Sequence, residues 1–235
     1  MIRHVLTDIE GTTTSIAFVK VTLFGHARRA LPAFVAAHGG EPRVRAELDA
    51  TRALLGDPAK TDGAVVEALL GFIDEDRKAT PLKALQGMIW EEGYQEGAYR
   101  AHIYPDVPAA LRRWKERGLL LSVFSSGSIH AQRLLFAHTE AGDLTPLFDR
   151  YFDTTTGPKT EAASYAAIAE ALSAEPREIL FLSDVAAELD AARRAGLCRV
   201  GVAREGARIE GGHPVVRSFD EIDQLHTSSS DEVAS

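Results

Sequence analysis

Short runs of apolar residues recur along the chain, and segments with helical spacing separate them. In one such segment Tyr165, Ile168 and Leu172 fall on a single helical face. A parallel strand that is covered on both faces has a nearly continuous apolar sequence. Five runs therefore predict strands, at residues 2–7, 119–124, 151–153, 179–182 and 198–202. Repeated strand–helix units predict an α/β fold with a doubly wound parallel sheet and right-handed crossovers.

The segment from residue 15 to residue 101 interrupts this pattern directly after the first strand. It is rich in Ala, Leu, Arg and Glu, it contains no convincing strand, and glycines at 39–40, 56 and 71 indicate turns. We interpret it as an inserted all-helical cap. The catalytic core is then expected to comprise residues 1–14 and 102–226, followed by a polar, disordered tail at 227–235.

Composition and charge exclude several classes of function. The 235 residues carry a formal net charge of −8, which argues against nucleic acid as a partner. No apolar run approaches the roughly 18–20 residues of a membrane span, and the first five residues lack the pattern of a signal peptide. The single cysteine, Cys198, excludes an internal disulfide framework and is expected to be a buried, inert thiol. We expect a cytoplasmic protein, and nothing in the sequence demands a dimer, so a monomer is expected.

Acidic residues follow two of the predicted strands. Asp8 and Glu10 come after the first strand, where a spacing of two places both side chains on one face of an extended backbone. Asp184 follows the strand at 179–182. Carboxylates that converge at one edge of a sheet repel one another unless a cation lies among them. Mg²⁺, which binds a few carboxylates together with waters and a phosphate oxygen, suits such a site.

Groups that suit an anion follow the other strands. Ser125 and Ser126 come directly after the strand at 119–124 and before a helix, whose first N–H groups favour anions. Lys159 supplies a positive charge after the strand at 151–153. These residues predict a small-molecule phosphate ester as the substrate. The serines are equally suited to capping the helix that follows.

Four segments carry a resemblance to a known superfamily. Residues 8–13, residues 125–128, Lys159 and residues 183–184 resemble, in order, the four motifs of the haloacid dehalogenase-like phosphatases. Residues 13–16, 85–90 with 93–94, and 103–107 further resemble the enolase-phosphatase (acireductone synthase) family of methionine salvage. Most members of the superfamily have Asp at the position of Glu10, whereas the enolase-phosphatases have Glu there.

The resemblance implies a role for each site residue. Asp8 would attack phosphorus and form an aspartyl-phosphate, and Glu10 would protonate the leaving oxygen and later activate water. Asp8, Asp184 and the main-chain carbonyl of Glu10 would hold one Mg²⁺ per chain. Lys159 and the two serines would hold the phosphoryl group. The substrate implied is 2,3-diketo-5-methylthiopentyl-1-phosphate, which the family enolises and then dephosphorylates to the acireductone.

Alternatives to these interpretations remain at the level of function and of single residues. A different capped phosphatase or a phosphomutase acting on a sugar phosphate would use the same motifs. A receiver-like phosphoacceptor also uses an Asp, a hydroxyl group, a Lys and Mg²⁺, but it leaves the helical insertion unexplained, and an inactive interaction domain would not need every motif position filled. Glu188 is interpreted as a partner of a helix dipole, and Asp106 as structural. Trp90, Tyr94 and Tyr99 are interpreted as cap core, with lining of a substrate pocket as the alternative.

Overall fold

The computed structural model describes residues 1–75 and 77–222. The expected tail at 227–235 and the last expected core residues, 223–226, lie outside these ranges. The chain divides into two compact units. One contains Met1–Ile16 and the chain from Ala101 onward, and the other consists of Ala17–Arg100.

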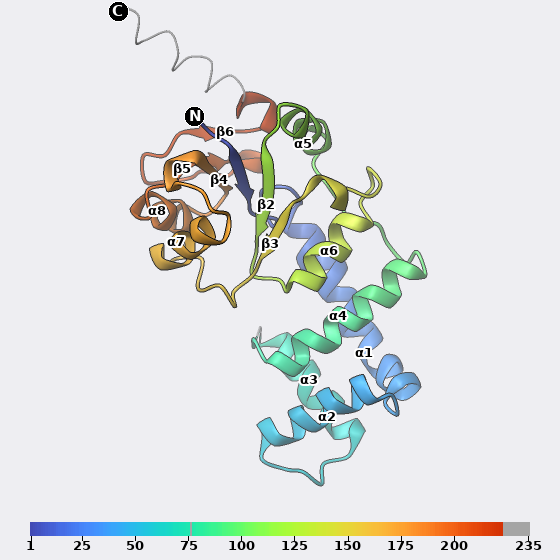
Figure 1. Cartoon of the computed structure of the whole chain (residues 1–235). Coiled ribbons are helices and arrows are strands. Elements are labelled where there is room, and N and C mark those ends of the chain that lie inside the picture. Colours follow the sequence, from blue (N-terminus) through green and yellow to red (C-terminus); the bar gives the residue numbers. More distant parts are fainter. Residues whose placement is uncertain (76, 223–235) are drawn as a thin grey trace, which may run out of the picture. The chain divides into compact units, whose positions relative to one another are not determined.

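The first unit is built on a fully parallel sheet, whose order within the described residues is β3-β2-β1-β4-β5-β6 (Figure 1). Leu6 of β1 lies opposite Phe181 of β4, and both side chains are buried. The order reverses at β1, which pairs with β2 on one side and β4 on the other, and ligands of such sheets bind at this switch point. The doubly wound fold expected from the sequence is confirmed. Its strands are β1 (His4–Thr7), β2 (Leu120–Phe124), β3 (Arg150–Phe152), β4 (Ile179–Ser183), β5 (Cys198–Val202) and β6 (Val215–Val216).

Helices cover the sheet on its two faces (Figure 1). On one face, Tyr165, Ile168 and Leu189 pack with Leu6 and Phe181 in a continuous apolar core. No helix in the described ranges has the length and hydropathy needed to cross a membrane. The helices of this unit are α5 (Asp106–Glu116), α6 (Ile129–Ala137), α7 (Ala162–Ala171) and α8 (Ala186–Arg194), with 3₁₀ turns at Thr145–Leu147, Pro176–Glu178, Arg204–Gly206 and Phe219–Glu221.

The described residues of the second unit, which omit position 76, form helices joined by short loops and contain no strand. Its helices enclose a core of their own, to which Leu31, Leu48, Leu69 and Leu85 contribute. The turn expected at Gly71 is wrong, because the helix that contains this glycine continues for three more residues. The elements are a π-helical segment (Phe18–Phe24), α1 (Gly25–His38), α2 (Pro42–Leu55), α3 (Asp62–Asp74) and α4 (Thr80–Gln95).

Two further details differ from the sequence expectations. The short edge strand β6 was not predicted, since two residues are too few for a periodic pattern. Cys198 is half-buried rather than buried, because it begins β5 at a point where β6 does not yet cover that strand. Neither difference affects the strand ends at the centre of the sheet.

The separate core of the second unit leads to a prediction about its stability. Leu48 of α2 is fully buried, whereas Leu54 of the same helix is 48% exposed. Leu48→Ala is expected to lower the free energy of unfolding by about 2–5 kcal/mol, because it removes buried methyl groups and leaves a cavity. Leu54→Ala, the matched control, is expected to change it by less than about 0.5 kcal/mol. Urea denaturation of both variants measures the difference, and equal effects would contradict this packing.

Candidate active site

A buried lysine lies at the centre of the candidate site. The Nζ atom of Lys159 is 2.7 Å from Oδ1 of Asp8 and 2.7 Å from Oε2 of Glu188. The side chains of Lys159 and Asp8 are each only 6% exposed. Burial by itself lowers the pKa of Lys159, but the charges of Asp8 and Glu188 outweigh it, so the pKa is raised and the ammonium stays charged.

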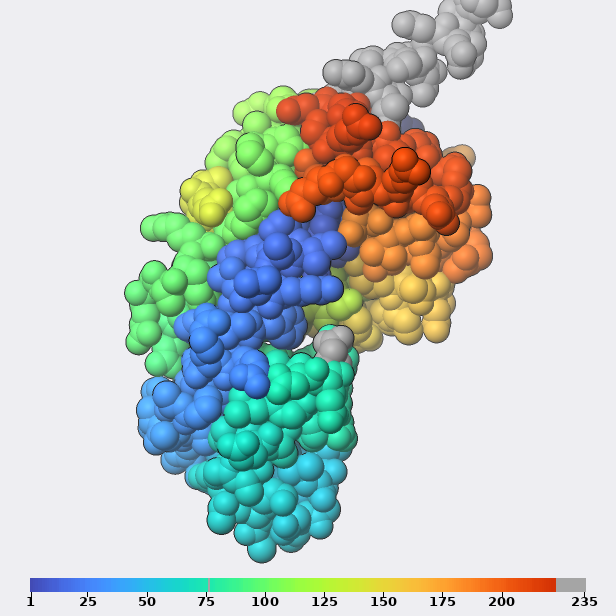
Figure 2. Space-filling model, turned by 180° about the vertical axis from the view of Figure 1, so that it is seen from behind, coloured from blue at the N-terminus to red at the C-terminus, as the bar shows by residue number. Residues whose placement is uncertain are grey.

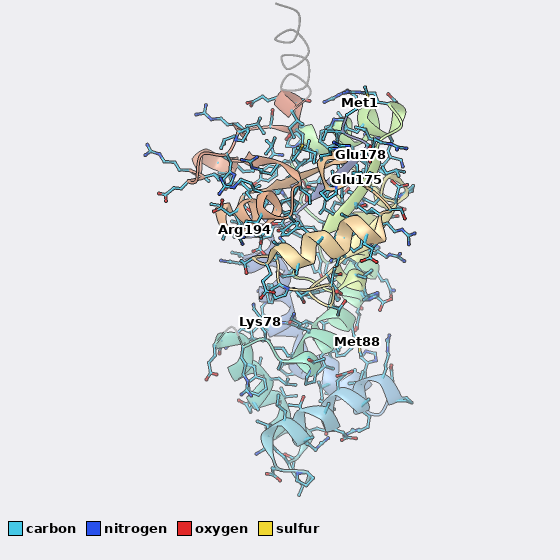
Figure 3. The ribbon with its side chains drawn as sticks, turned by 60° about the vertical axis from the view of Figure 1, so that its left-hand side comes forward. Met1, Lys78, Met88, Glu175, Glu178 and Arg194 are labelled. Atoms are coloured by element: carbon cyan, nitrogen blue, oxygen red, sulfur yellow. The ribbon has the colours of Figure 1, made fainter. Side chains whose placement is uncertain are left out.

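Hydrogen bonds from two helices hold the loop that carries this lysine. The hydroxyl of Tyr165, on α7, donates to the main-chain carbonyl of Lys159 at 2.7 Å. Arg194, labelled in Figure 3 at the end of α8, donates from Nη2 to the carbonyl of Thr160 at 3.0 Å. The ammonium therefore enters the site from a backbone that is fixed at Lys159 and at the residue after it.

Asp8 stands where β1 ends and a tight loop begins. Its main-chain N–H donates to the carbonyl of Leu182 in β4 at 2.9 Å, which extends the sheet pairing by one residue. The N–H of Ile9 donates to Oδ1 of Asp8 at 2.8 Å, so this carboxylate accepts a main-chain bond as well as the lysine. Glu10 follows on the same loop and is half-buried. Gly11 turns the loop with φ +76°, a conformation that favours glycine.

Asp184 lies against this loop from the end of β4. A Cβ atom added to Gly11 would overlap the Asp184 carboxylate, so the glycine allows the close approach of the two segments. The Oδ1 atom of Asp184 is buried and has no hydrogen-bond partner among the described residues. Burial, followed by the charge of Asp8, raises the pKa of Asp184 to about 6. The structure thus brings Asp8 and Asp184 together, as the sequence predicts, and their like charges repel each other.

This arrangement suits a divalent cation of the hard type. In residues 1–75 and 77–222 no group of three His, Cys, Asp or Glu side chains is arranged as a metal site. Mg²⁺ does not need three, because it commonly takes one or two carboxylates and completes its shell with waters and phosphate oxygens. Such a cation would give the buried Oδ1 of Asp184 a partner, and it would reduce the repulsion between Asp184 and Asp8. Asp8 and Asp184 are the side chains able to hold it.

The serine segment lies beyond the end of β2. Ser125 is buried, and its Oγ accepts a bond from the N–H of Gly127 at 3.2 Å, whereas Ser126 is exposed. The cap of α6 is Ser128, whose Oγ accepts from the N–H of Ala131 at 3.3 Å. The interpretation of Ser125 and Ser126 as helix caps is therefore wrong, and both residues lie in the loop that precedes the helix.

Glu188 is the residue that the sequence analysis undervalued. It lies in the first turn of α8, as expected of a partner of a helix dipole, but it is buried and bound to Lys159. Its Oε2 also accepts from the Oγ of Ser183 at 2.9 Å. Burial, followed by the charge of Asp8, raises the pKa of Glu188. Its position one helical turn after Asp184 was the signal available in the sequence.

Comparison with known proteins shows the family of the chain. A family model described as haloacid dehalogenase-like hydrolase matches residues 2–196. Enolase-phosphatase E1 of Azotobacter vinelandii is 59% identical over 222 residues, covering 94% of this chain and 97% of that protein. Enolase-phosphatase E1 of Methylococcus capsulatus is 54% identical over 222 residues, covering 94% and 98%.

Solved structures agree with these relatives. The UTR4 protein of Saccharomyces cerevisiae superimposes with a TM-score of 0.82 at 33% identity and covers 94% of this chain and 99% of its own. CbbY of Rhodobacter sphaeroides in complex with phosphate has a TM-score of 0.59 at 20% identity and covers 94% and 96%. The second likeness extends to the fold alone.

The central ion pairs predict a pH-dependent loss of stability when the lysine is removed. Lys159→Met leaves the carboxylates of Asp8 and Glu188 without their cation. It is expected to lower the free energy of unfolding by about 3–5 kcal/mol at neutral pH. The pKa of Glu188, already above its unfolded value, rises further in this variant. The protonated form is thus favoured on folding, so stability is retained at pH 5 and lost as the pH rises toward 8.

Urea denaturation between pH 5 and 8 in a chelator-containing buffer measures this effect. Lys115→Met is the matched control, because Lys115 pairs with Asp149 at 2.9 Å with both side chains more exposed. It is expected to cost about 1 kcal/mol or less. If the cost of Lys159→Met were the same at every pH, this account of the carboxylates would be wrong.

Proposed function

The chain belongs to the enolase-phosphatase E1 family of haloacid dehalogenase-like hydrolases, and we propose on this basis how its residues carry out the reaction. The substrate proposed is 2,3-diketo-5-methylthiopentyl-1-phosphate, which is enolised and then dephosphorylated to the acireductone of methionine salvage. The observation that carries the proposal is the Asp8 carboxylate, buried at a strand end and held against the ammonium of Lys159 at 2.7 Å.

In this mechanism Asp8 is the nucleophile. The N–H of Ile9 and the ammonium of Lys159 orient its carboxylate. Its attack on phosphorus breaks the P–O bond to the leaving group and forms an aspartyl-phosphate, and water then attacks phosphorus and restores the carboxylate. Two displacements replace one difficult hydrolysis, and fixed charges stabilise both.

Glu10 supplies the proton transfers. It lies two residues beyond Asp8 on the Gly11 loop, and we assign to it the protonation of the leaving oxygen in the first displacement. Its carboxylate then takes a proton from the attacking water in the second displacement. General acid–base catalysis of this kind contributes roughly 10²–10⁴-fold to a rate.

The phosphate ester would be held by Lys159, Ser125 and Ser126. A phosphate monoester brings about two negative charges to a site that already contains carboxylates. Asp8, Asp184 and the main-chain carbonyl of Glu10 would hold one Mg²⁺ per chain. When bound, this cation neutralises phosphate charge and polarises a substrate carbonyl for enolisation. We further propose a cytoplasmic monomer whose partner is this small molecule and not a nucleic acid or a membrane.

A time-resolved assay tests the function. With the diketo phosphate, Mg²⁺ and the full chain, a transient enol absorbance is expected before the release of phosphate. The alternative, a phosphatase or phosphomutase for a sugar phosphate, predicts no enol transient and equal or faster reaction of sugar phosphates. That outcome would overturn the proposed substrate.

Substitution of the two proposed reacting carboxylates gives separable results. Asp8→Asn is expected to abolish turnover, because the amide cannot form the acyl phosphate. Glu10→Gln is expected to lower kcat by roughly 10²–10⁴-fold while the acyl phosphate still forms. Acid quenching and detection of the phosphorylated chain measure both variants. Full turnover by Glu10→Gln would contradict the role of this residue.

The approach of Gly11 to Asp184 provides another prediction, with a closely matched control. Gly11→Ala places a methyl group on the Asp184 carboxylate, so it is expected to weaken Mg²⁺ binding and to reduce turnover at least tenfold. Gly118 has a similar φ of +79° but no atom within 4 Å of an added Cβ. Gly118→Ala should therefore cost about 1–2 kcal/mol of stability from backbone strain while turnover is unchanged. Titration of turnover with Mg²⁺ compares the two variants.

A further inference from the structure

A buried arginine outside the recognised motifs binds the loop of the nucleophile. Arg204 follows β5, is 7% exposed, and donates from Nε to the main-chain carbonyl of Thr12 at 3.0 Å. The two residues are 192 positions apart in the sequence. On the face shown in Figure 2, the orange-red residues after β5 adjoin the blue N-terminal residues.

The arginine is itself fixed from three directions. Its Nη1 donates to Oδ1 of Asp106 at 2.9 Å and to the carbonyl of Arg217 at 3.1 Å. The guanidinium lies 4.4 Å from the centroid of the Tyr104 ring. The other oxygen of Asp106 accepts from the N–H of Phe219 at 2.7 Å. A planar fork that satisfies several acceptors at once is a property of Arg that Lys does not share.

The loop that Arg204 contacts is closed by its own bonds and is held from outside at separate points. The N–H groups of Thr12, Thr13 and Thr14 all donate to the carbonyl of Ile9, at 3.2, 2.9 and 2.9 Å. These bonds close the turn. Beyond it, the N–H of Tyr104 donates to the carbonyl of Thr13 at 3.0 Å and the Oγ1 of Thr14 donates to the carbonyl of His102 at 2.6 Å, so the far end of the loop is joined to residues 102–104. The Thr12 carbonyl, two residues after Glu10, is joined to the structure by Arg204. Asp8, by contrast, is anchored independently through the sheet and through Lys159.

We propose that Arg204 is a positioning residue for Glu10, which it holds in place through the Thr12 carbonyl so that the acid–base carboxylate faces the oxygen being protonated. The inference rests on the proposed function, because it assigns a role in that reaction. Loss of the contact releases the Thr12 carbonyl, two residues after Glu10, while the bonds of Asp8 to the sheet and of Thr13 and Thr14 to residues 102–104 remain. A misplacement of about 1 Å can cost roughly 10²-fold in rate.

Two substrates that differ in their leaving group distinguish this positioning role from a general loss of structure. An alkyl phosphate needs a proton on its leaving oxygen, whereas an aryl phosphate with an acidic phenol does not. In Arg204→Lys, formation of the acyl phosphate from the alkyl ester is expected to slow about 10- to 100-fold, with KM nearly unchanged. Formation from the aryl ester should keep its rate, and the acyl phosphate should accumulate because water activation also needs Glu10. Partial unfolding would lower both rates by the same factor.

Two further variants complete the experiment. Arg113→Lys is the control, because Arg113 forms a comparable pair with Asp220 at 2.8 Å on the surface, and it should leave both rates unchanged. Asp106→Asn weakens the anchor of Arg204. Like Arg204→Lys, it should slow acyl phosphate formation from the alkyl ester and leave the rate from the aryl ester unchanged. It also keeps the inference testable if Arg204→Lys folds poorly.

A double-mutant cycle decides whether Arg204 acts through Glu10. Arg204→Lys in a Glu10→Gln background is expected to have no further effect on kcat, because the carboxylate being positioned is already gone. Additive effects, or equal slowing of both esters, would overturn the inference while leaving the proposed function intact. A wild-type chain that does not turn over the diketo phosphate would overturn the proposed function, and this inference with it.

Discussion

The buried ion pairs between Lys159 and the carboxylates of Asp8 and Glu188 are the interaction on which the rest of the site depends. A charge in the protein interior is costly unless it is paired, and removal of one partner leaves the others uncompensated. The three residues come from three segments, the ends of β1 and of the β3–α7 loop and the first turn of α8. The site is therefore complete only when these three segments are packed together.

One positive charge does not balance this group of carboxylates, and that imbalance explains the chemistry. Burial, followed by the charge of Asp8, raises the pKa of Asp184 to about 6, and its Oδ1 has no partner among the described residues. Either a bound cation or a proton on one carboxyl group would reduce this repulsion. A bound anionic ester favours the cation, because it adds further negative charge to the site. The net charge of −8 is an average over the molecule and says little about this local field.

The central part of the fold was predictable because each strand there is a continuous apolar run with a polar residue at its end. This is also why Asp8, Asp184 and Ser125 could be selected as candidates before any contact was known, whereas Lys159 lies in the loop between β3 and α7. The turn at Gly71 was wrongly predicted for a physical reason. An added Cβ there would meet nothing, and the buried residues on either side, such as Leu69 and Phe72, keep the helix in place.

The residues that sequence analysis undervalued or missed are those whose roles depend on distant partners. Glu188 looks like an ordinary first-turn acid until Lys159, 29 positions earlier, is found against it. Arg204 is harder still, since its partner at Thr12 is a main-chain carbonyl, which no side-chain pattern marks. A main-chain contact does not depend on the side chain of the residue contacted. Positioning residues of this kind can be found by looking for buried cationic side chains that contact the loop of a reacting residue.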